Sequence, residues 1–470
     1  MRSGPLAFAI LFGTTGCVRY QARPISPADG AAALETRRLD DPGVRTFIEG
    51  NLGRELSPWP PWSWDLHTLT LAAFYYHPDL DVARARWAIA SGGVVTAGAL
   101  PNPTLSLSPE YVLSSGNPSP WIFGFRLDIP LQTYGKRGYR VAQARASGEA
   151  ARLGVAGAAW QVRSRLRSSL LGLWVAGTRF ALIERERSIQ EEIAGLIERR
   201  RDVGEASEQD LTRERIELER LRVAARNSET QRAQGRAHVA AAIGVPAAAL
   251  EQVEISFEAF DVTPPANPPE SDLRRRALLG RADVEALLAE YAAAQAALQL
   301  EIARQYPDLS LGPGYSWSQG ANHYLIGISL TLPLFNRNQG PIAEAEARRK
   351  EVAARFTGLQ ARILGDLDRA LSGYLSASRA AGDAESLLYQ ERLRQGQVER
   401  AFSAGEADRV ALAGANLQLA AAEVSRFDAR VEQVRLLGEL EDALQRPLSG
   451  PEPPFGRQEP EPQRREEHRR

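Results

Sequence analysis

The sequence predicts a mainly α-helical fold with a small transmembrane β part, in which each chain combines long antiparallel coiled-coil helices with four strands. Three observations indicate this fold: a strand-to-helix corner that occurs twice, a tandem duplication, and long segments without proline. The chain has 470 residues, of which 44% are hydrophobic and 24% are charged, and both fractions lie within the range of globular proteins.

The strand-to-helix corner is clearest in LTLPLFNRNQGPIAEAEARRK, residues 330–350. The alternation of apolar and polar residues stops near Pro333, a polar stretch follows, and a helical composition begins after Gly340. The same arrangement occurs earlier, with Pro130 at the end of the strand and Gly138 before the helix. Because proline ends a strand ladder and glycine tolerates unusual backbone angles, we expect these four residues to form the two corners.

The two corners belong to a duplication with an offset of about 200 positions. The tripeptide Gly-Glu-Ala at 204 recurs at 405, HPDLDVA at 77 corresponds to RADVEAL at 281, and PNPTLSLSPEY at 101 corresponds to QYPDLSLGPGY at 305. A constant offset over several landmarks indicates a tandem repeat that covers most of the chain.

Each repeat contains a predicted β-hairpin whose strands have two different faces. SPWIFGFRLDIPL and NHYLIGISLTLPL both alternate large apolar or aromatic residues with residues that are mostly small or polar. This pattern is typical of strands with lipid on one side and water on the other. The alternative is a soluble sandwich with one face in water.

Four strands are too few to close a transmembrane barrel. Bacterial barrels begin at about eight strands, and an open sheet edge is not stable in hydrocarbon. We therefore expect the chain to pool its strands with identical copies, so that two copies would supply eight strands and three copies twelve.

The helical segments have the same plan in both repeats. One long arm covers about 138–201 and a second about 341–402, and each returns through a shorter arm that ends near 243 or 445. Further short helices are expected at about 271–305, stacked end to end with the return arm that ends near 243, and at about 65–100, stacked with the return arm that ends near 445. Apolar residues spaced by seven indicate left-handed supercoiling; two such rows are Leu182, Ile189, Leu196, Val203 and Leu211, Leu218, Ala225. An ordinary coiled-coil protein is the alternative, and the strands in each repeat argue against it.

The N-terminus has the pattern of an export signal. Arg2 precedes a short apolar segment, and small residues lead to Cys17, the only cysteine in the sequence. The context of Cys17 resembles a bacterial lipobox, which predicts an acylated cysteine as the mature N-terminus in the envelope of a diderm bacterium. The alternative is a free thiol behind an ordinary signal peptide.

These features divide the chain into six parts. We expect a signal peptide at 1–16, a lipidated N-terminal and equatorial region at 17–63, a first repeat at 64–255, a Pro-rich linker at 256–270, a second repeat at 271–446 and a disordered tail at 447–470. The strands are expected at about 104–131 and 308–334, and the helical hairpin tips near 204 and 405.

Composition argues against an enzyme, a metal centre and a nucleic-acid-binding protein. The formal net charge is −1, whereas nucleic-acid binding usually needs a basic surface. The five histidines lie far apart, and neither a nucleophile with a base nor a metal-binding motif is present. The sequence therefore predicts no catalytic residue, no resident metal and no cofactor apart from the lipid on Cys17.

The hairpins, long arms, duplication and export signal together resemble one family, the bacterial outer-membrane efflux proteins, or TolC-like outer-membrane factors. The resemblance covers about residues 64–446, and LPLFNRNQG is its most specific segment. Within the family the sequence is most similar to the CusC- and CzcC-like lipoprotein channels of heavy-metal efflux systems of the resistance-nodulation-division (RND) type.

The resemblance implies a homotrimer with a 12-strand barrel in the outer membrane and a 12-helix tunnel in the periplasm. It implies a passive exit duct, which a periplasmic membrane-fusion adaptor and an inner-membrane RND-type pump open, and which exports heavy-metal cations. A duct for organic compounds or for type I protein secretion is the first alternative, and a periplasmic coiled-coil structural lipoprotein is the second.

The resemblance also implies roles for residues at the two Gly-Glu-Ala turns. Asp210 matches the position of a gate aspartate, with Glu406 and Asp408 as further sources of charge at the constriction. The residues that match the adaptor-contact pattern are Arg200, Arg201, Gly204, Ser207, Arg400 and Gly405.

Overall fold

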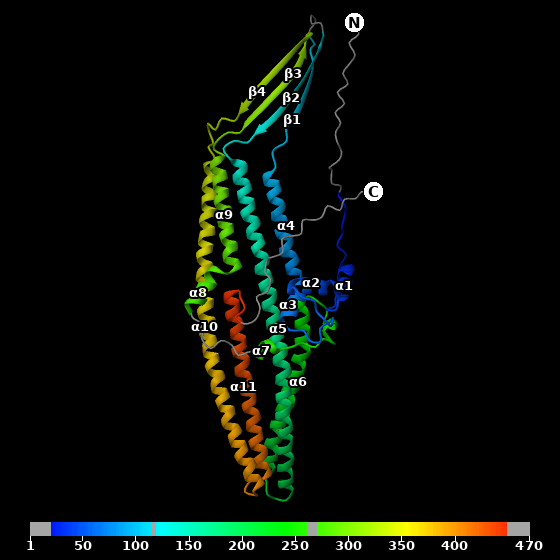
Figure 1. Ribbon diagram of the computed structural model, residues 1–470, viewed down its shortest axis with the longest axis vertical. Coiled ribbons are helices and arrows are strands. Elements are labelled where there is room, and N and C mark those ends of the chain that lie inside the picture. The colour runs from blue at the N-terminus through cyan, green and yellow to red at the C-terminus, as the bar shows by residue number, and fades with distance from the viewer. Residues whose placement is uncertain (1–19, 114–118, 262–269, 449–470) are drawn as a thin grey trace.

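The computed structural model describes residues 20–113, 119–261 and 270–448. The chain forms a long rod, with a β-sheet at one end and two helical hairpin tips at the other (Figure 1). Cys17 and most of the expected disordered tail lie outside the described residues, as does the 262–269 part of the Pro-rich linker.

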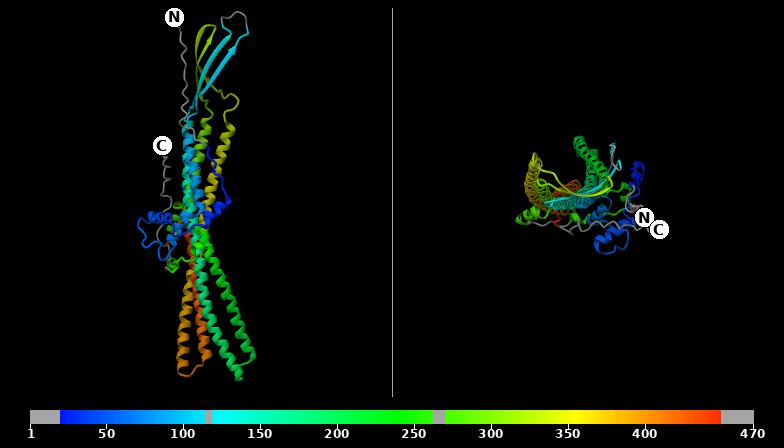
Figure 2. Two further views of the ribbon diagram at one scale, coloured as in Figure 1. Left: turned by 90° about the vertical axis from the view of Figure 1, so that its right-hand side faces the viewer. Right: turned by 90° about the horizontal axis from the view of Figure 1, so that it is seen from above.

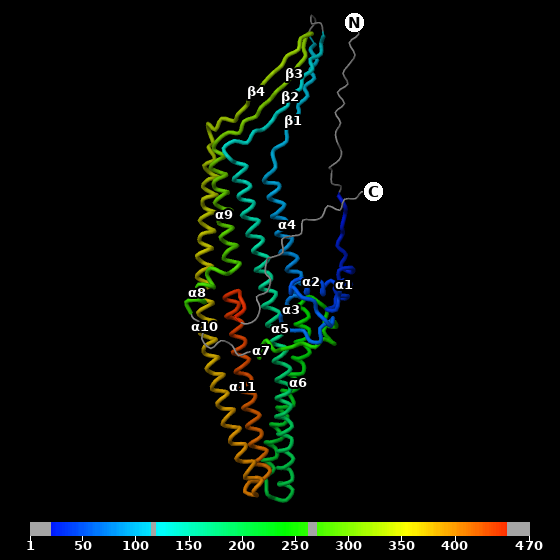
Figure 3. Tube along the Cα trace, viewed as in Figure 1, coloured from blue at the N-terminus to red at the C-terminus, as the bar shows by residue number. Residues whose placement is uncertain are grey.

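Two long helices run from the sheet to the tips without interruption (Figure 3). α5 (Lys136–Asp202) has 67 residues and α10 (Gln339–Ser403) has 65. At ~1.5 Å per residue, each helix is about 100 Å long. None of the helices in the described ranges combines the length and the hydropathy needed to cross a bilayer.

The shorter helices are stacked in pairs beside the long ones, as predicted, but the predicted partners are wrong, because each return arm meets the short helix of its own repeat and not that of the other. α6 (Glu208–Ile243) leads up from the first tip towards α4 (Pro78–Gly98), and α11 (Arg409–Leu444) leads up from the second tip towards α9 (Ala282–Ala303). α5 packs against α6 below and against α4 above, and α10 packs against α11 and α9 in the same way. The two halves of the chain therefore repeat one architecture.

An arginine stabilises each joint between stacked helices. Arg37 donates to the backbone oxygens of Tyr76 and Gly244, where α6 ends near the start of α4. Arg281 donates to the backbone oxygen of Ala443, where α11 ends near the start of α9. Gly244 has a positive φ of 91°, and a Cβ there would lie 3.0 Å from the backbone oxygen of Tyr76, so this close approach requires glycine.

A band of small elements surrounds the middle of the rod. It contains α1 (Pro27–Glu35), α2 (Pro42–Leu52), α3 (Leu66–Tyr76), the 3₁₀ helix η1 (Ala247–Leu250), α7 (Glu258–Asp261) and α8 (Glu270–Leu279). The two hydrophobic cores lie at this level, one between α2, α3, α5 and α6, and the other between α8, α10 and α11. The fold is therefore held mainly at its equator.

The four strands form one antiparallel sheet in the order β1 (Thr104–Tyr111), β2 (Trp121–Leu131), β3 (Leu309–Ser318), β4 (Ala321–Leu330). The register places a row of large apolar side chains across all four strands, because Leu107, Phe125, Tyr315 and Tyr324 are successive cross-strand partners. The next row consists of Ser108, Gly124, Ser316 and His323. Cross-strand partners share a face, so one face is apolar and the other is small or polar, as predicted.

The bends between sheet and helices lie within the predicted segments, but different residues form them. Gly135 (φ 71°) and Asn338 (φ 63°) have left-handed backbones immediately before α5 and α10. Gly138 and Gly340 are already inside those helices, so their predicted role in the turn is wrong. Asparagine tolerates the left-handed region better than most residues, and this lets it replace glycine at the second corner.

The two corner prolines stand in different places. Pro130 lies within β2, two residues beyond Asp128, the last β2 residue that pairs with β1, so its missing N–H costs no hydrogen bond on that side. Pro333 follows the end of β4 at Leu330. Both positions agree with the tolerance of proline only where a strand lacks a partner.

Candidate functional site

A groove about 1290 Å³ in volume runs along the upper half of the rod, between α4, α5, α9 and α10. Seen from above, the helices and the sheet form an arc, and α1, α2 and α3 lie outside it (Figure 2). Because all four helices contribute to the lining, the groove marks the concave side of this arc.

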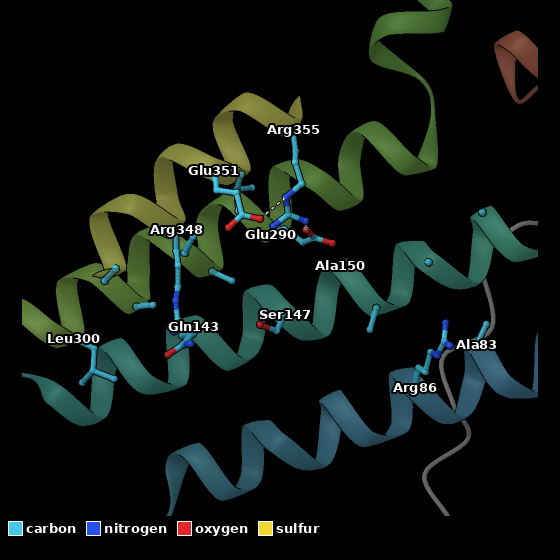
Figure 4. Close-up of a pocket in the computed structure, with 18 of the residues that line it drawn as sticks. Ala83, Arg86, Gln143, Ser147, Ala150, Glu290, Leu300, Arg348, Glu351 and Arg355 are labelled. Carbon is cyan, nitrogen blue, oxygen red and sulfur yellow. Dashed lines mark hydrogen bonds and ion pairs between the residues drawn. The ribbon is translucent and has the colours of Figure 1, made fainter. Parts of the chain in front are cut away.

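The floor of the groove consists of small or uncharged side chains. α5 supplies Gln143, Ser147, Ala150 and Gly154 among others, and α9 supplies several alanines. Charged side chains come from α4, α9 and α10, as in the case of Arg86, and extend towards the same space (Figure 4). Small residues at the floor keep the space open, and the charged walls keep it hydrated.

Below the equator the chain separates into two helical hairpins, α5 with α6 and α10 with α11 (Figure 2). Ion pairs between α5 and α11 connect the two hairpins along their length. The pairs are Arg179 with Asp428, Arg185 with Glu423, Glu192 with Arg409, and Arg200 with Asp408. Sequence reasoning missed this ladder, because it depends on the register between two helices more than 200 residues apart in the chain.

Both hairpin tips turn at the predicted glycines. Gly204 (φ 81°) and Gly405 (φ 77°) have left-handed backbones, and nothing lies within 4 Å of a Cβ built at either position. Glycine is therefore needed for its backbone conformation and not for space.

The four remaining predicted tip residues differ in their contacts. Arg200 contacts Asp408 across the two repeats, whereas Arg201 pairs within its own hairpin with Asp202 and Glu208. Ser207 is the N-cap of α6, and Arg400 lies exposed in the last turn of α10. The structure brings them all to one end of the rod.

The predicted gate residue Asp210 takes part in a capping box at the start of α6. Its carboxylate accepts from the backbone N and the hydroxyl of Ser207, at 3.1 Å and 2.6 Å, and the Asp210 N–H donates to the Ser207 hydroxyl. The hydrogen bonds from Ser207 lower the pKa of the Asp210 carboxyl. Helix capping is therefore sufficient to explain why an aspartate occupies position 210.

Asp408 combines a cap with the inter-repeat contact. One carboxylate oxygen accepts from the backbone N of Ala411 at 2.7 Å, and the other pairs with Arg200. The backbone hydrogen bond from Ala411 and the Arg200 guanidinium both lower the pKa of this carboxyl, so it is ionised at neutral pH. Asp408 is therefore the tip acid that connects the two repeats directly.

A buried charge cluster joins the repeats at the equator. Glu441 of α11 is 2% exposed and lies 3.6 Å from Arg163 and 3.4 Å from Arg167 of α5. Burial lowers the pKa of Arg163. Arg167 also packs against Gly438, where a Cβ would lie 1.9 Å from its guanidinium, so a larger residue at 438 would force the guanidinium to move. This cluster holds α5 and α11 together above the point where the hairpins separate.

No group of three or more histidine, cysteine, aspartate or glutamate side chains in the described ranges could hold a metal ion. The predicted lipidation site, Cys17, has no described environment. The structural features of interest are therefore the apolar sheet face, the groove and the tips.

Comparison with known proteins agrees with this arrangement. A family model described as "Outer membrane efflux protein" matches residues 73–245. The "Cobalt-zinc-cadmium resistance protein CzcC" of Cupriavidus metallidurans is 27% identical over 371 residues, which cover 78% of this chain and 84% of that protein.

Solved structures share the fold at lower identity. The outer membrane protein VceC of Vibrio cholerae matches with a TM-score of 0.67 and 19% identity, over 82% of this chain and 97% of that one. CusC, whose structures are described in terms of transmembrane channel formation, matches with a TM-score of 0.65 and 17% identity, over 83% of this chain and 94% of that one. By its matching segment, its relative CzcC and its fold, the chain is similar to outer membrane efflux proteins.

Proposed function

We propose that this chain is the outer-membrane channel of a tripartite efflux system, in which it acts as a passive exit duct for heavy-metal cations. The observation that carries the proposal is a sheet with one predominantly apolar face, joined directly to helices that enclose a groove. The similarity to a cobalt-zinc-cadmium resistance protein supports the choice of cargo.

The duct is a homotrimer, because one chain cannot form a closed wall. The sheet has four strands, with β1 and β4 at its edges. Such edges are not stable in hydrocarbon, and barrels begin at about eight strands. Three copies would give twelve strands around the barrel and twelve helices around the tunnel. The concave groove of each chain then faces the lumen.

The two tips are the docking surface for a periplasmic adaptor, which connects the duct to an inner-membrane pump. Arg200, Arg201 and Ser207 lie beside the first turn and Arg400 beside the second, all at the end farthest from the sheet. Acylation of Cys17 would attach the same chain to the membrane. Labelling with a radioactive fatty acid tests this attachment, since Cys17→Ser would abolish the label.

Susceptibility of a deletion strain tests the cargo. We expect loss of this chain to increase sensitivity to zinc, cobalt or cadmium, to leave sensitivity to a panel of organic drugs unchanged, and to be reversed by a plasmid copy. Sensitivity to the drugs alone would contradict the metal assignment and favour a drug duct. Loss of a secreted protein, with unchanged sensitivity to both panels, would favour type I secretion.

A charge reversal at the tip tests whether the inter-repeat contact keeps the duct closed. In Arg200→Glu a carboxylate faces Asp408, so the contact changes from attractive to repulsive. An exposed pair contributes about 0.2–1 kcal/mol, and the repulsion adds about 1 kcal/mol in water. We therefore expect the open probability of single channels in planar bilayers to rise about five- to thirtyfold.

Two further variants separate the contact from a general charge effect. Arg199→Glu makes the same change one residue earlier, at an exposed position without an ion pair in the described part of the chain, and should leave the open probability near that of the wild type. Adding Asp408→Asn to Arg200→Glu removes the repulsion while asparagine still caps α11, and should lower the open probability again. Equal opening by Arg199→Glu would contradict a specific role for Arg200.

A further inference from the structure

We propose that Arg355 and its neighbouring arginines set the ion selectivity of the upper duct, because they neutralise its carboxylates and prevent the wall from retaining divalent cations. This inference rests on the proposed function, since it takes the concave groove as the lumen. It concerns the wall above the equator and not the tips.

The charges of the groove are almost balanced. The lining contains four arginines and five carboxylates, all from α4, α10 and α9 with its C-cap residue Arg304. One of the carboxylates, Asp79, pairs at 2.7 Å with Arg165, which lies outside the lining. The remaining four carboxylates are matched in number by the four arginines, so the wall has little net charge.

Three of the four arginines contact carboxylates of the lining, and Arg355 makes the central contacts. Its guanidinium lies 3.4 Å from Glu290 of α9 and 3.4 Å from Glu351 of its own helix, α10 (Figure 4). Arg304 pairs with Glu301, which lies three residues earlier in the chain. Arg348 lies 4.0 Å from Glu344.

Arg355 occupies the place that a divalent cation would take. Glu290 and Glu351 lie on two helices on either side of one guanidinium. Two converging carboxylates are the usual protein ligands of hard divalent cations, and a trimer would contain three such sites. Removing the guanidinium would expose this carboxylate pair to the lumen.

Arg86 adds positive charge from the opposite wall. It is exposed on α4, lines the groove, and has no ion pair within the described part of the chain. A cation that passes this wall therefore meets guanidinium groups and neutralised carboxylates. Conduction requires weak binding, so a compensated wall lets exported cations leave instead of holding them.

The rates at which charged thiol reagents modify a single cysteine measure the potential in the groove. Ala294 lies one helical turn from Glu290 and lines the groove, so Ala294→Cys places a thiol beside the Arg355 contacts. Purified protein is treated at low ionic strength with a cationic or an anionic methanethiosulfonate. Peptide mass spectrometry then gives the two rates at residue 294, each relative to a free thiol.

For Ala294→Cys alone, the inference predicts that the ratio of the cationic to the anionic modification rate is close to the ratio for a free thiol. Adding Arg355→Ala should raise the cation rate and lower the anion rate about fivefold each, which corresponds to about 1 kcal/mol for a charge a few ångströms away, and so raise the ratio about 25-fold. Arg355→Lys, which keeps the charge, and Arg38→Ala, which removes an exposed arginine of the equatorial band, should leave it unchanged. A strongly cation-favouring ratio before any arginine is removed, or no change in Arg355→Ala, would overturn the inference.

A parallel measurement on intact cells distinguishes this inference from the proposed function. If the groove is the lumen, reagents added outside the cell reach residue 294 in an open-tip background such as Arg200→Glu. Failure to label there, with normal labelling of purified protein, would contradict the groove as the lumen. The rate ratio in purified protein would still decide whether Arg355 controls the potential.

Discussion

Replacing Ile326 with arginine is expected to prevent assembly of the chain in the outer membrane. Ile326 is 78% exposed in the single chain and lies on the apolar face of β4, in line with Tyr324 and Ile328. An arginine on the lipid face near the middle of a bilayer costs about 2–4 kcal/mol. A homotrimer would carry that cost three times, so we expect folded trimers in outer-membrane fractions to fall below detection on unheated denaturing gels.

The neighbouring position provides a matched control. Leu325 is also apolar, and its side chain is 48% exposed, but it points to the opposite face of β4 and pairs across to Gly314. Because that face is small or polar and would face water, Leu325→Arg should assemble at close to the wild-type level. Equal assembly of both variants, or failure of both, would contradict the assignment of the two faces.

Replacing Glu441 with glutamine is expected to destabilise the equator strongly. Arg163 and Arg167 would then lie in a buried site without their compensating carboxylate. Removing one partner of a buried ion pair typically costs about 3–5 kcal/mol. We expect the free energy of unfolding, measured by circular dichroism of detergent-solubilised protein in guanidinium chloride, to fall by about that amount.

Glu439→Gln is the control for this change. Glu439 lies two residues earlier on α11 and pairs with Arg435, and both side chains are about half exposed. A surface pair contributes about 0–1 kcal/mol, so this variant should unfold close to the wild type. If Glu441→Gln and Glu439→Gln lower the free energy of unfolding equally, the buried cluster of Arg163, Arg167 and Glu441 contributes no more than a surface ion pair.

Much of this fold could be predicted from the sequence, because it depends on local patterns. Alternation of apolar and polar residues correctly assigned the two strand faces, and the spacing of Leu211, Leu218 and Ala225 correctly assigned a buried row on α6. The duplication correctly predicted that both halves share one plan of long and stacked helices, although it stacked each return arm with the short helix of the wrong repeat. Each of these predictions needs only the period of the pattern and the order of the elements.

Register was predicted less well than period. The row through Leu182 and Ile189 has the correct spacing, but the buried row of α5 is one residue further on, at Ala176, Ile183 and Gln190. α5 packs against other helices on several sides, and small side chains such as alanine lie where those helices come closest. Large apolar residues therefore do not identify the buried face by themselves.

The sequence predicted where the tips lie, but not which side chains contact one another there. The sequence placed Asp210 at a gate, and the structure shows its carboxylate capping α6 through Ser207. It could not pair Arg200 with Asp408, which are distant in the chain and meet only after both hairpins have packed. A role in gating stays a prediction for both aspartates.

The number of copies in the native particle tests the central claim most directly, namely that one chain supplies a third of a pore. Native mass spectrometry of protein extracted from outer membranes in mild detergent should show three copies of the chain and no stable single copy. A stable single copy, with the aromatic side chains of β2 and β4 protected from detergent within its own fold, would contradict the duct.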